Sequence, residues 1–145
     1  MLTIVMGPSC AGKSTYIKEH FPNEKVIDVF DFQDYRFATP ETVWQSYEDC
    51  AKALQDALKE NENVVLEHTL LKAIRREWYI QKVREVSDCD IKVICIFPSL
   101  KMLQSRSRKR KCISTADYCQ AMLDTLELPQ KEEGYSEVEI VRVEA

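Results

Sequence analysis

Residues 2–14 join an apolar run to a G-x-x-x-x-G-K-[ST] pattern: Leu2-Thr3-Ile4-Val5-Met6, then Gly7-Pro8-Ser9-Cys10-Ala11-Gly12-Lys13-Ser14. Such a loop binds phosphate when a buried strand precedes it and a helix begins where it ends. Backbone N–H groups and the helix dipole then converge on the anion. Leu2–Met6 supply the strand, and residues 13–20 have a helical composition that Phe21-Pro22-Asn23 interrupts. The sequence therefore predicts a binding site for a nucleoside triphosphate.

The loop residues have separate predicted roles. Gly7 and Gly12 let the backbone approach phosphate oxygens closely. Lys13 reaches the β- and γ-phosphates, and Ser14 offers its hydroxyl to Mg²⁺. The residues expected to contact the nucleotide are Gly7, Pro8, Ser9, Cys10, Ala11, Gly12, Lys13, Ser14 and Thr15. ATP and Mg²⁺ are the cofactors that this set predicts.

Composition limits the class of protein. A chain of 145 residues is expected to form one domain, residues 1–145. The net charge of −4 argues against a surface that coats nucleic acid generally, so any affinity for a polyanion needs a local basic patch. The six cysteines lack zinc-ligand spacing, and no apolar stretch is long enough to span a bilayer. We expect a cytoplasmic protein with reduced thiols and no membrane contact; its oligomeric state is not indicated.

Helices and strands are expected to alternate along the chain. The expected strands are residues 2–6, 25–30, 64–66, 91–97 and 138–143, the last at a sheet edge. The expected helices are residues 13–20, 40–60, 72–86, 99–108 and 116–126, with Thr39 capping the second and Ile74 and Trp78 facing inward on the third. This order predicts a three-layer α/β fold of the P-loop NTPase type, with a mostly parallel five-stranded sheet covered by helices on both faces.

Acidic residues follow two of the predicted strands, at the sheet edge where ligands bind in such folds. After the second strand, Asp31 or Asp34 could accept a proton from an attacking hydroxyl, whereas Asp28 is interpreted as a turn residue. Glu67 follows the third strand and resembles the acidic position that holds Mg²⁺ or its water. His68, beside it, fits a structural role as well as a catalytic one.

A basic segment lies between residues 99 and 114, where no acidic residue occurs. It could be a solvated helix face or a patch for nucleic acid. The third interpretation is a lid, because arginines placed over a transferring phosphoryl group stabilise its charge. Arg106 and Arg110 are one helical turn apart and would project from the same face. We therefore predict that both are catalytic, together with Lys13 and an aspartate.

Over residues 2–128 the chain resembles the kinase domain of phage-type 5′-hydroxyl polynucleotide kinases, within the zeta-toxin-like and AAA_33-like group of small P-loop kinases. The resemblance rests on the phosphate loop, Asp34-Tyr35-Arg36, a strand leading to Thr69, the pair Arg75-Arg76, and a strand–proline–helix leading to Arg106 and Arg110. It implies that Arg36, Thr69 and Arg75 contact the acceptor.

The chain departs from this family at two motifs. Gln33 stands where the family has its general base, so Asp34 or Asp31 would take that role. His68-Thr69-Leu70 replaces the family's Asp-Thr-Asn, which removes polar contacts. The resemblance does not extend to the phosphatase domain that some members carry. The leading hypothesis is an ATP-dependent kinase acting on a polynucleotide 5′-hydroxyl. The alternatives are a kinase for a small molecule (nucleoside, nucleotide sugar or antibiotic) and a nucleotide-binding regulator without transferase activity.

Overall fold

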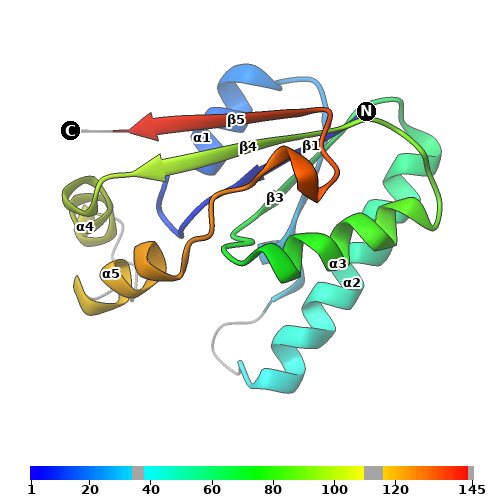
Figure 1. The fold of residues 1–145 in the computed structure, drawn as a ribbon. Helices are drawn as coiled ribbons and strands as arrows, with labels where there is room; N and C mark the ends of the chain where they lie inside the picture. The colour runs from blue at the N-terminus through cyan, green and yellow to red at the C-terminus, as the bar shows by residue number, and fades with distance from the viewer. Residues whose placement is uncertain (34–37, 110–115, 144–145) are drawn as a thin grey trace.

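A computed structural model describes residues 1–33, 38–109 and 116–143. Its centre is a five-stranded sheet in the order β2-β3-β1-β4-β5, in which every neighbouring pair is parallel (Figure 1). The strands are β1 (Leu2–Met6), β2 (Lys25–Asp28), β3 (Val64–His68), β4 (Ile91–Pro98) and β5 (Glu137–Val143). The predicted strand at residues 138–143 is confirmed as an edge strand.

Helices cover both faces of the sheet. They are α1 (Lys13–His20), α2 (Pro40–Glu60), α3 (Ala73–Arg84), α4 (Leu100–Lys109) and α5 (Ala116–Thr125), with short 3₁₀ turns η1 (Val29–Phe32) and η3 (Lys131–Glu133). Figure 1 shows α1 on one face and the α2–α3 pair on the other, while α4 and α5 lie beyond the carboxyl end of β4. The predicted three-layer α/β architecture is confirmed.

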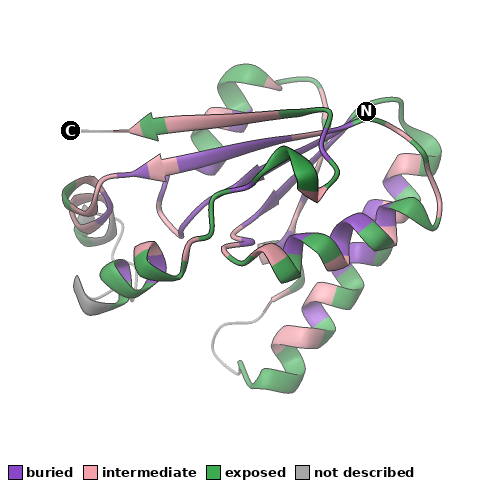
Figure 2. Cartoon of the chain, viewed as in Figure 1, coloured by how far each residue is buried: buried purple, intermediate pink, exposed green. Residues whose placement is uncertain are grey.

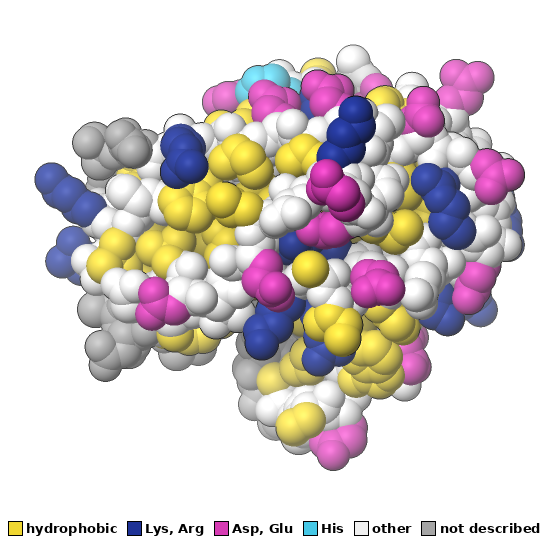
Figure 3. Space-filling model, viewed as in Figure 1, with side chains coloured by type: hydrophobic (Ala, Val, Ile, Leu, Met, Phe, Trp, Pro, Cys, Tyr) yellow, Lys and Arg dark blue, Asp and Glu magenta, His cyan; other side chains and the backbone are white. Residues whose placement is uncertain are grey.

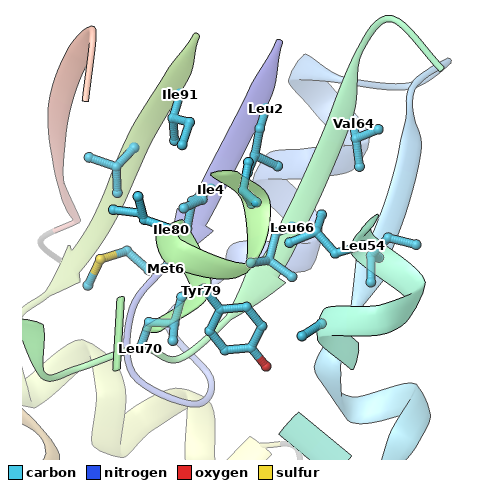
Figure 4. Packing of buried hydrophobic residues seen from close by; sticks show 14 of the residues in the cluster. Leu2, Ile4, Met6, Leu54, Val64, Leu66, Leu70, Tyr79, Ile80 and Ile91 are labelled. Carbon is cyan, nitrogen blue, oxygen red and sulfur yellow. The ribbon is translucent and has the colours of Figure 1, made fainter. Parts of the chain in front are cut away.

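Strand alternation divides the core into two layers. Leu2, Ile4 and Met6 pack against α2 and α3 in the larger cluster, which Figure 4 shows from close by. Val5 points the other way and packs with Ile17 of α1. Figure 2 shows the resulting pattern, with buried residues along β1, β3 and β4 and exposed ones on the outer helix surfaces. The near-continuous burial of these strands is typical of a parallel sheet with helices on both faces.

The long helix α2 begins as predicted. The Thr39 side chain accepts a hydrogen bond from the Thr42 amide at 3.2 Å, and Pro40 occupies the first helical position. The helix ends at Glu60, and Asn61 Nδ2 donates to the Ala57 carbonyl at 2.9 Å. None of the helices in the described ranges is long and apolar enough to cross a membrane.

Two local expectations are wrong. The second strand ends at Asp28 because the chain turns into η1, where the Asp28 carboxylate accepts from the Phe30 amide at 2.9 Å. On α3, Ile74 is 68% exposed, and Arg76 is fully buried instead. An arginine can replace an apolar residue there because its guanidinium is fully paired, as described below.

Candidate functional site

The segment between β1 and α1 forms a tight loop at the carboxyl ends of the strands. Gly7 has a φ of +151° and Gly12 a φ of +101°, both in the region that favours glycine. A Cβ on Gly7 would lie 2.5 Å from the Ile96 carbonyl oxygen, and one on Gly12 would collide with the Arg106 guanidinium. The Gly7 amide donates to the Thr69 carbonyl at 3.2 Å. Both glycines are therefore required by geometry, and the loop is fixed to the chain that follows β3.

Lys13 is folded back on its own loop. Its side chain is buried, and Nζ donates to the carbonyls of Gly7 and Pro8 at 2.9 Å and 2.8 Å. Burial lowers the pKa of Lys13 to about 8, although the carboxylates of Glu67 and Asp28 oppose the effect. An anion held by the loop would favour the charged form. The ammonium group therefore lies at the loop, bound to two of its carbonyls.

A hydroxyl and two carboxylates meet beside this loop. Ser14 Oγ donates to Glu67 at 3.0 Å from Oε1 and 2.9 Å from Oε2. Asp28 and Glu67 are paired in register at the ends of β2 and β3. Burial raises the pKa of Glu67, and the neighbouring Asp28 charge raises it further. A divalent cation would relieve the repulsion between the carboxylates, so these oxygen donors fit Mg²⁺.

The remaining ligands of such a cation would come from outside the chain. The described ranges contain no group of three or more His, Cys, Asp or Glu side chains that could hold a metal ion. Mg²⁺ commonly keeps water and substrate phosphates and takes only one or two carboxylates from the protein. The predicted pair of metal-binding residues, Ser14 and Glu67, is brought together as such a site requires.

Asp28 is the site residue whose position the sequence analysis missed. Its hydrogen bond to the Phe30 amide agrees with the predicted turn role, but its place beside Glu67 adds a second negative charge to the cation site. A signal was present in the sequence: Asp28 follows Val26 and Ile27 much as Glu67 follows Val65 and Leu66. Equivalent ends of neighbouring parallel strands place such residues together.

Helix α4 brings an arginine onto the loop. Arg106 Nη1 donates to the Ala11 carbonyl, and the guanidinium lies against Gly12. The helix is held there by an apolar cluster in which Leu103 of α4 and Met122 of α5 are buried and Cys10 of the loop packs alongside. Arg108, two residues further on, is exposed. The basic segment therefore contacts the phosphate loop directly through Arg106.

The other predicted site residues have more varied positions. Asp31 is exposed in η1, Thr15 is exposed on α1, and Thr69 is half-buried at the end of β3. The Arg75 guanidinium is exposed and lies over the Trp44 ring, 5.4 Å from its centroid. Three further predicted residues, Asp34, Arg36 and Arg110, lie outside the described residues.

Arg76 is a buried residue that stabilises the turn next to the phosphate loop. Its side chain is fully buried and pairs with Glu133 at 2.8 Å from Nε and 3.1 Å from Nη2. Nη1 also donates to the Leu70 carbonyl at 2.8 Å, and Leu70 has a positive φ of 42°. Arg76 thus fixes the turn that directly follows Thr69, the residue whose carbonyl receives the Gly7 amide.

His68 is a buried histidine within an aromatic cluster. The Tyr79 hydroxyl donates its hydrogen to the Tyr47 carbonyl at 3.2 Å. His68 Nε2 lies 3.1 Å from the Tyr79 hydroxyl oxygen, which can then only accept, so Nε2 must carry the proton. Nδ1 is buried and has no hydrogen-bond partner among the described residues. Burial lowers the pKa of His68 to about 3, and the Lys13 charge contributes in the same direction. His68 is therefore neutral in the folded protein at physiological pH.

Acidification is expected to destabilise the protein through His68. Below its ordinary pKa of 6.5 the unfolded chain gains a proton that the folded chain does not take up until about pH 3. Between about pH 7.5 and pH 5 this difference costs about 2 kcal/mol of unfolding free energy. Denaturant unfolding of the wild type and of His68→Gln at both pH values measures it.

The comparison with His68→Gln is needed because Glu67 acts in the opposite sense. Its raised pKa means that the folded protein takes up a proton before the unfolded chain does, so Glu67 adds stability as the pH falls. Both proteins keep this contribution, and the difference between their pH dependences isolates His68. Parallel pH dependences in the two proteins would contradict a buried, neutral His68.

Comparison with solved structures identifies the fold. A gluconokinase from Sinorhizobium meliloti 1021 superposes with a TM-score of 0.67 and 22% identity, covering 97% of this chain and 81% of that one. A putative kinase from Chloroflexus aurantiacus gives a TM-score of 0.74 at 13% identity, over 97% and 84% of the two chains. A chain of the Pnkp1/Rnl/Hen1 RNA repair complex gives a TM-score of 0.71 at 20% identity, over 86% of this chain and 43% of that one.

These likenesses show that the chain has the α/β fold of P-loop kinases. No curated protein matches the chain in sequence. A family model does: that of AAA_33, described as an AAA domain, matches residues 2–129. This match covers most of the chain, from β1 to the segment after α5. The chain therefore belongs to the AAA_33 family of P-loop proteins.

Proposed function

We propose that the protein is an ATP-dependent kinase that transfers the γ-phosphate of ATP to a hydroxyl group. The observation that carries this proposal is the convergence of Lys13, Ser14, Glu67 and Arg106 on one loop. These residues supply a cation for the phosphates, oxygen donors for Mg²⁺ and a second cation on a separate helix. Phosphoryl transfer depends mainly on positioning and on stabilising charge at the phosphate oxygens, which this group of side chains can do.

Each side chain has a role in this mechanism. Lys13 would leave the Gly7 and Pro8 carbonyls and bind the β- and γ-phosphates. Ser14 and Glu67 would hold Mg²⁺, which neutralises charge on the phosphate oxygens when bound. Arg106 would leave the Ala11 carbonyl and bind the transferring group, where negative charge spreads over the equatorial oxygens. The acceptor hydroxyl loses its proton to an aspartate, either Asp34 or Asp31.

For the acceptor we propose the 5′-hydroxyl of a polynucleotide. Support comes from the resemblance through Asp34-Tyr35-Arg36 and Arg75, from the basic segment on α4, and from the fold shared with the RNA repair chain. A small-molecule acceptor is the second candidate. It is favoured by a likeness to the gluconokinase that extends over 97% of this chain, and by the loss of polar groups at His68 and Leu70.

Incubation with γ-labelled ATP and Mg²⁺ tests the proposal and separates the acceptors. The panel of acceptors holds 5′-hydroxyl RNA, 5′-hydroxyl DNA, nucleosides, gluconate and simple alcohols. For the two oligonucleotides, the 5′-phosphorylated form is the blocked control. Label on the 5′-hydroxyl oligonucleotides alone supports the polynucleotide acceptor. Label on a small molecule alone supports the second candidate. Nucleotide binding without any transfer would favour the regulator that Gln33 suggests.

The identity of the general base gives a separate prediction. We expect Asp34→Asn to lower turnover by about two to four powers of ten, because the acceptor hydroxyl loses its proton acceptor. ATP affinity should change little. Asp31→Asn is the matched control, with the same change of charge in the same segment, and is expected to stay active. Steady-state kinetics on both variants decide between them, and the reverse pattern would assign the role to Asp31.

A further inference from the structure

Two cations flank a pair of aromatic rings on the outer surface of the α2–α3 layer. The Arg75 guanidinium lies 5.4 Å from the centroid of the Trp44 ring, and the Trp44 and Trp78 centroids are 5.0 Å apart. Lys82, one helical turn after Trp78 on α3, places Nζ 5.5 Å from the centroid of the Trp78 ring. The order is therefore cation, ring, ring, cation. Figure 3 shows hydrophobic and basic side chains next to one another over this layer, in the lower part of the view.

A groove of about 410 Å³ runs beside these rings. We call it the tryptophan groove; its lining includes Trp44, Trp78, Lys52, Lys59 and Lys82. Glu48 and Asp56 also line it, so three lysines face two carboxylates in a chain whose net charge is −4. Lys82 Nζ also lies 3.6 Å from Glu85 Oε1, so the charges of these side chains nearly balance in an otherwise acidic protein, and Arg75 adds a positive charge at one end.

The two tryptophans do more than join the helices. The contact between α2 and α3 is already filled by fully buried side chains, including Leu54, Tyr79 and Val83. Trp44 and Trp78 are only half-buried and border open space. Half-buried aromatic rings beside cations are typical of surfaces on which nucleobases stack. A stacked base would take the place of the Arg75 or Lys82 group that lies over each ring.

The groove also begins at the catalytic edge of the sheet. Arg75 is in the first turn of α3, which starts four residues after the half-buried Thr69. From Arg75 to Lys82 the helix rises about 10 Å, which is about three base steps of 3.4 Å. A strand whose end lies at the phosphate loop could therefore continue along α3.

We propose that the tryptophan groove binds single-stranded nucleic acid, with bases stacked on Trp44 and Trp78 and phosphates held by the lysines. The proposal rests on the polynucleotide acceptor proposed above and extends it from the terminal nucleotide to the following ones. Stacking tolerates any base, because every base has a π-face. Affinity for the groove should therefore depend on the length of the strand and little on its sequence.

Tryptophan fluorescence, excited selectively over that of the six tyrosines, reports on this groove alone, because Trp44 and Trp78 are the only tryptophans in the chain. We expect 5′-hydroxyl oligonucleotides of DNA and of RNA to quench it saturably, without ATP and with binding that strengthens from dinucleotide to hexanucleotide. Inorganic polyphosphate carries similar charge without bases and should not quench. Equal quenching by polyphosphate, or none by any oligonucleotide, would overturn the proposal.

Variants of the groove provide a second measurement, made by the anisotropy of a labelled hexanucleotide. Trp78→Ala is expected to weaken binding about 5- to 100-fold through the loss of stacking. Lys82→Ala and Lys59→Ala, which remove exposed or half-exposed side chains, should each lower the slope of log affinity against log salt by about 0.7. Lys131→Ala, an exposed lysine on η3, is the matched control. Unchanged affinity and salt slope in all three groove variants would contradict the proposal.

The kinase assay separates this proposal from the proposed function. Groove variants should raise KM for a hexanucleotide acceptor and leave kcat and the KM for a mononucleotide acceptor unchanged. Transfer to oligonucleotides without any effect of the variants would leave the function standing and exclude the groove. Quenching and length-dependent binding without transfer would support the groove and exclude the polynucleotide kinase.

Discussion

Lys13→Ala is expected to lower turnover by about two to three powers of ten, the usual cost of removing one preorganised donor at a developing charge. Lys13 Nζ is buried at the loop, held by the Gly7 and Pro8 carbonyls until phosphate replaces them. The fold should survive, because burial makes the charged lysine costly to the folded state, as its lowered pKa shows. Steady-state kinetics with γ-labelled ATP and thermal unfolding measure the two effects.

Lys18→Ala is the control for this experiment. Lys18 is exposed on the same helix, so its loss changes the net charge equally without touching the loop. Its kinetics should match those of the wild type. Normal turnover of ATP by Lys13→Ala would show that the phosphate loop is not the site of transfer.

Arg106→Ala is the second large expected effect, with a loss in kcat of about three powers of ten or more if the arginine meets charge in the transition state. The acceptor's affinity should change little, because such an interaction is made only during transfer. Arg110→Ala is expected to behave in the same way. Arg106 already touches the Ala11 carbonyl, so the side chain has only a short distance to move.

Arg108→Ala provides the matched comparison, because Arg108 is exposed on the same helix and points away from Arg106. It should leave kcat unchanged and, at most, weaken acceptor binding and its salt dependence. Kinetics at two salt concentrations distinguish these behaviours. A loss of acceptor affinity with preserved kcat in Arg106→Ala would mean that α4 anchors a polyanion and that the transition-state charge is handled elsewhere.

The phosphate loop and the order of elements could be predicted because they depend on local signals. Lys13 and Ser14 are placed by a short motif, and Thr39 and Pro40 start α2 through their own side chains. Glu67 could be placed because an apolar strand leads directly to it. In each case a few neighbouring residues carry the whole signal, and no distant contact is needed to read it.

Other features depend on partners far along the chain, and the sequence could not supply these. Ile74 was expected to face inward because apolar residues usually do, yet α3 is turned so that Arg76 enters the core. That orientation is possible only because Glu133, 57 residues away, neutralises the guanidinium. Asp28 is a similar case, because it lies beside Glu67 at the cation site only when β2 and β3 are adjacent in the sheet. Such pairings follow from sheet order and helix rotation, which periodicity alone does not determine.

The buried position of Lys13 has a calorimetric consequence. Because burial lowers the pKa of Lys13 to about 8, a substantial fraction of the side chain is uncharged at that pH, whereas a bound triphosphate favours the protonated form. Nucleotide binding near pH 8 should therefore draw protons from the buffer. The heat measured on titration would then differ between HEPES and Tris, whose ionisation enthalpies differ and neither of which carries a phosphate group. The same binding also exchanges existing hydrogen bonds for new ones, so its intrinsic enthalpy should be modest for so highly charged a ligand.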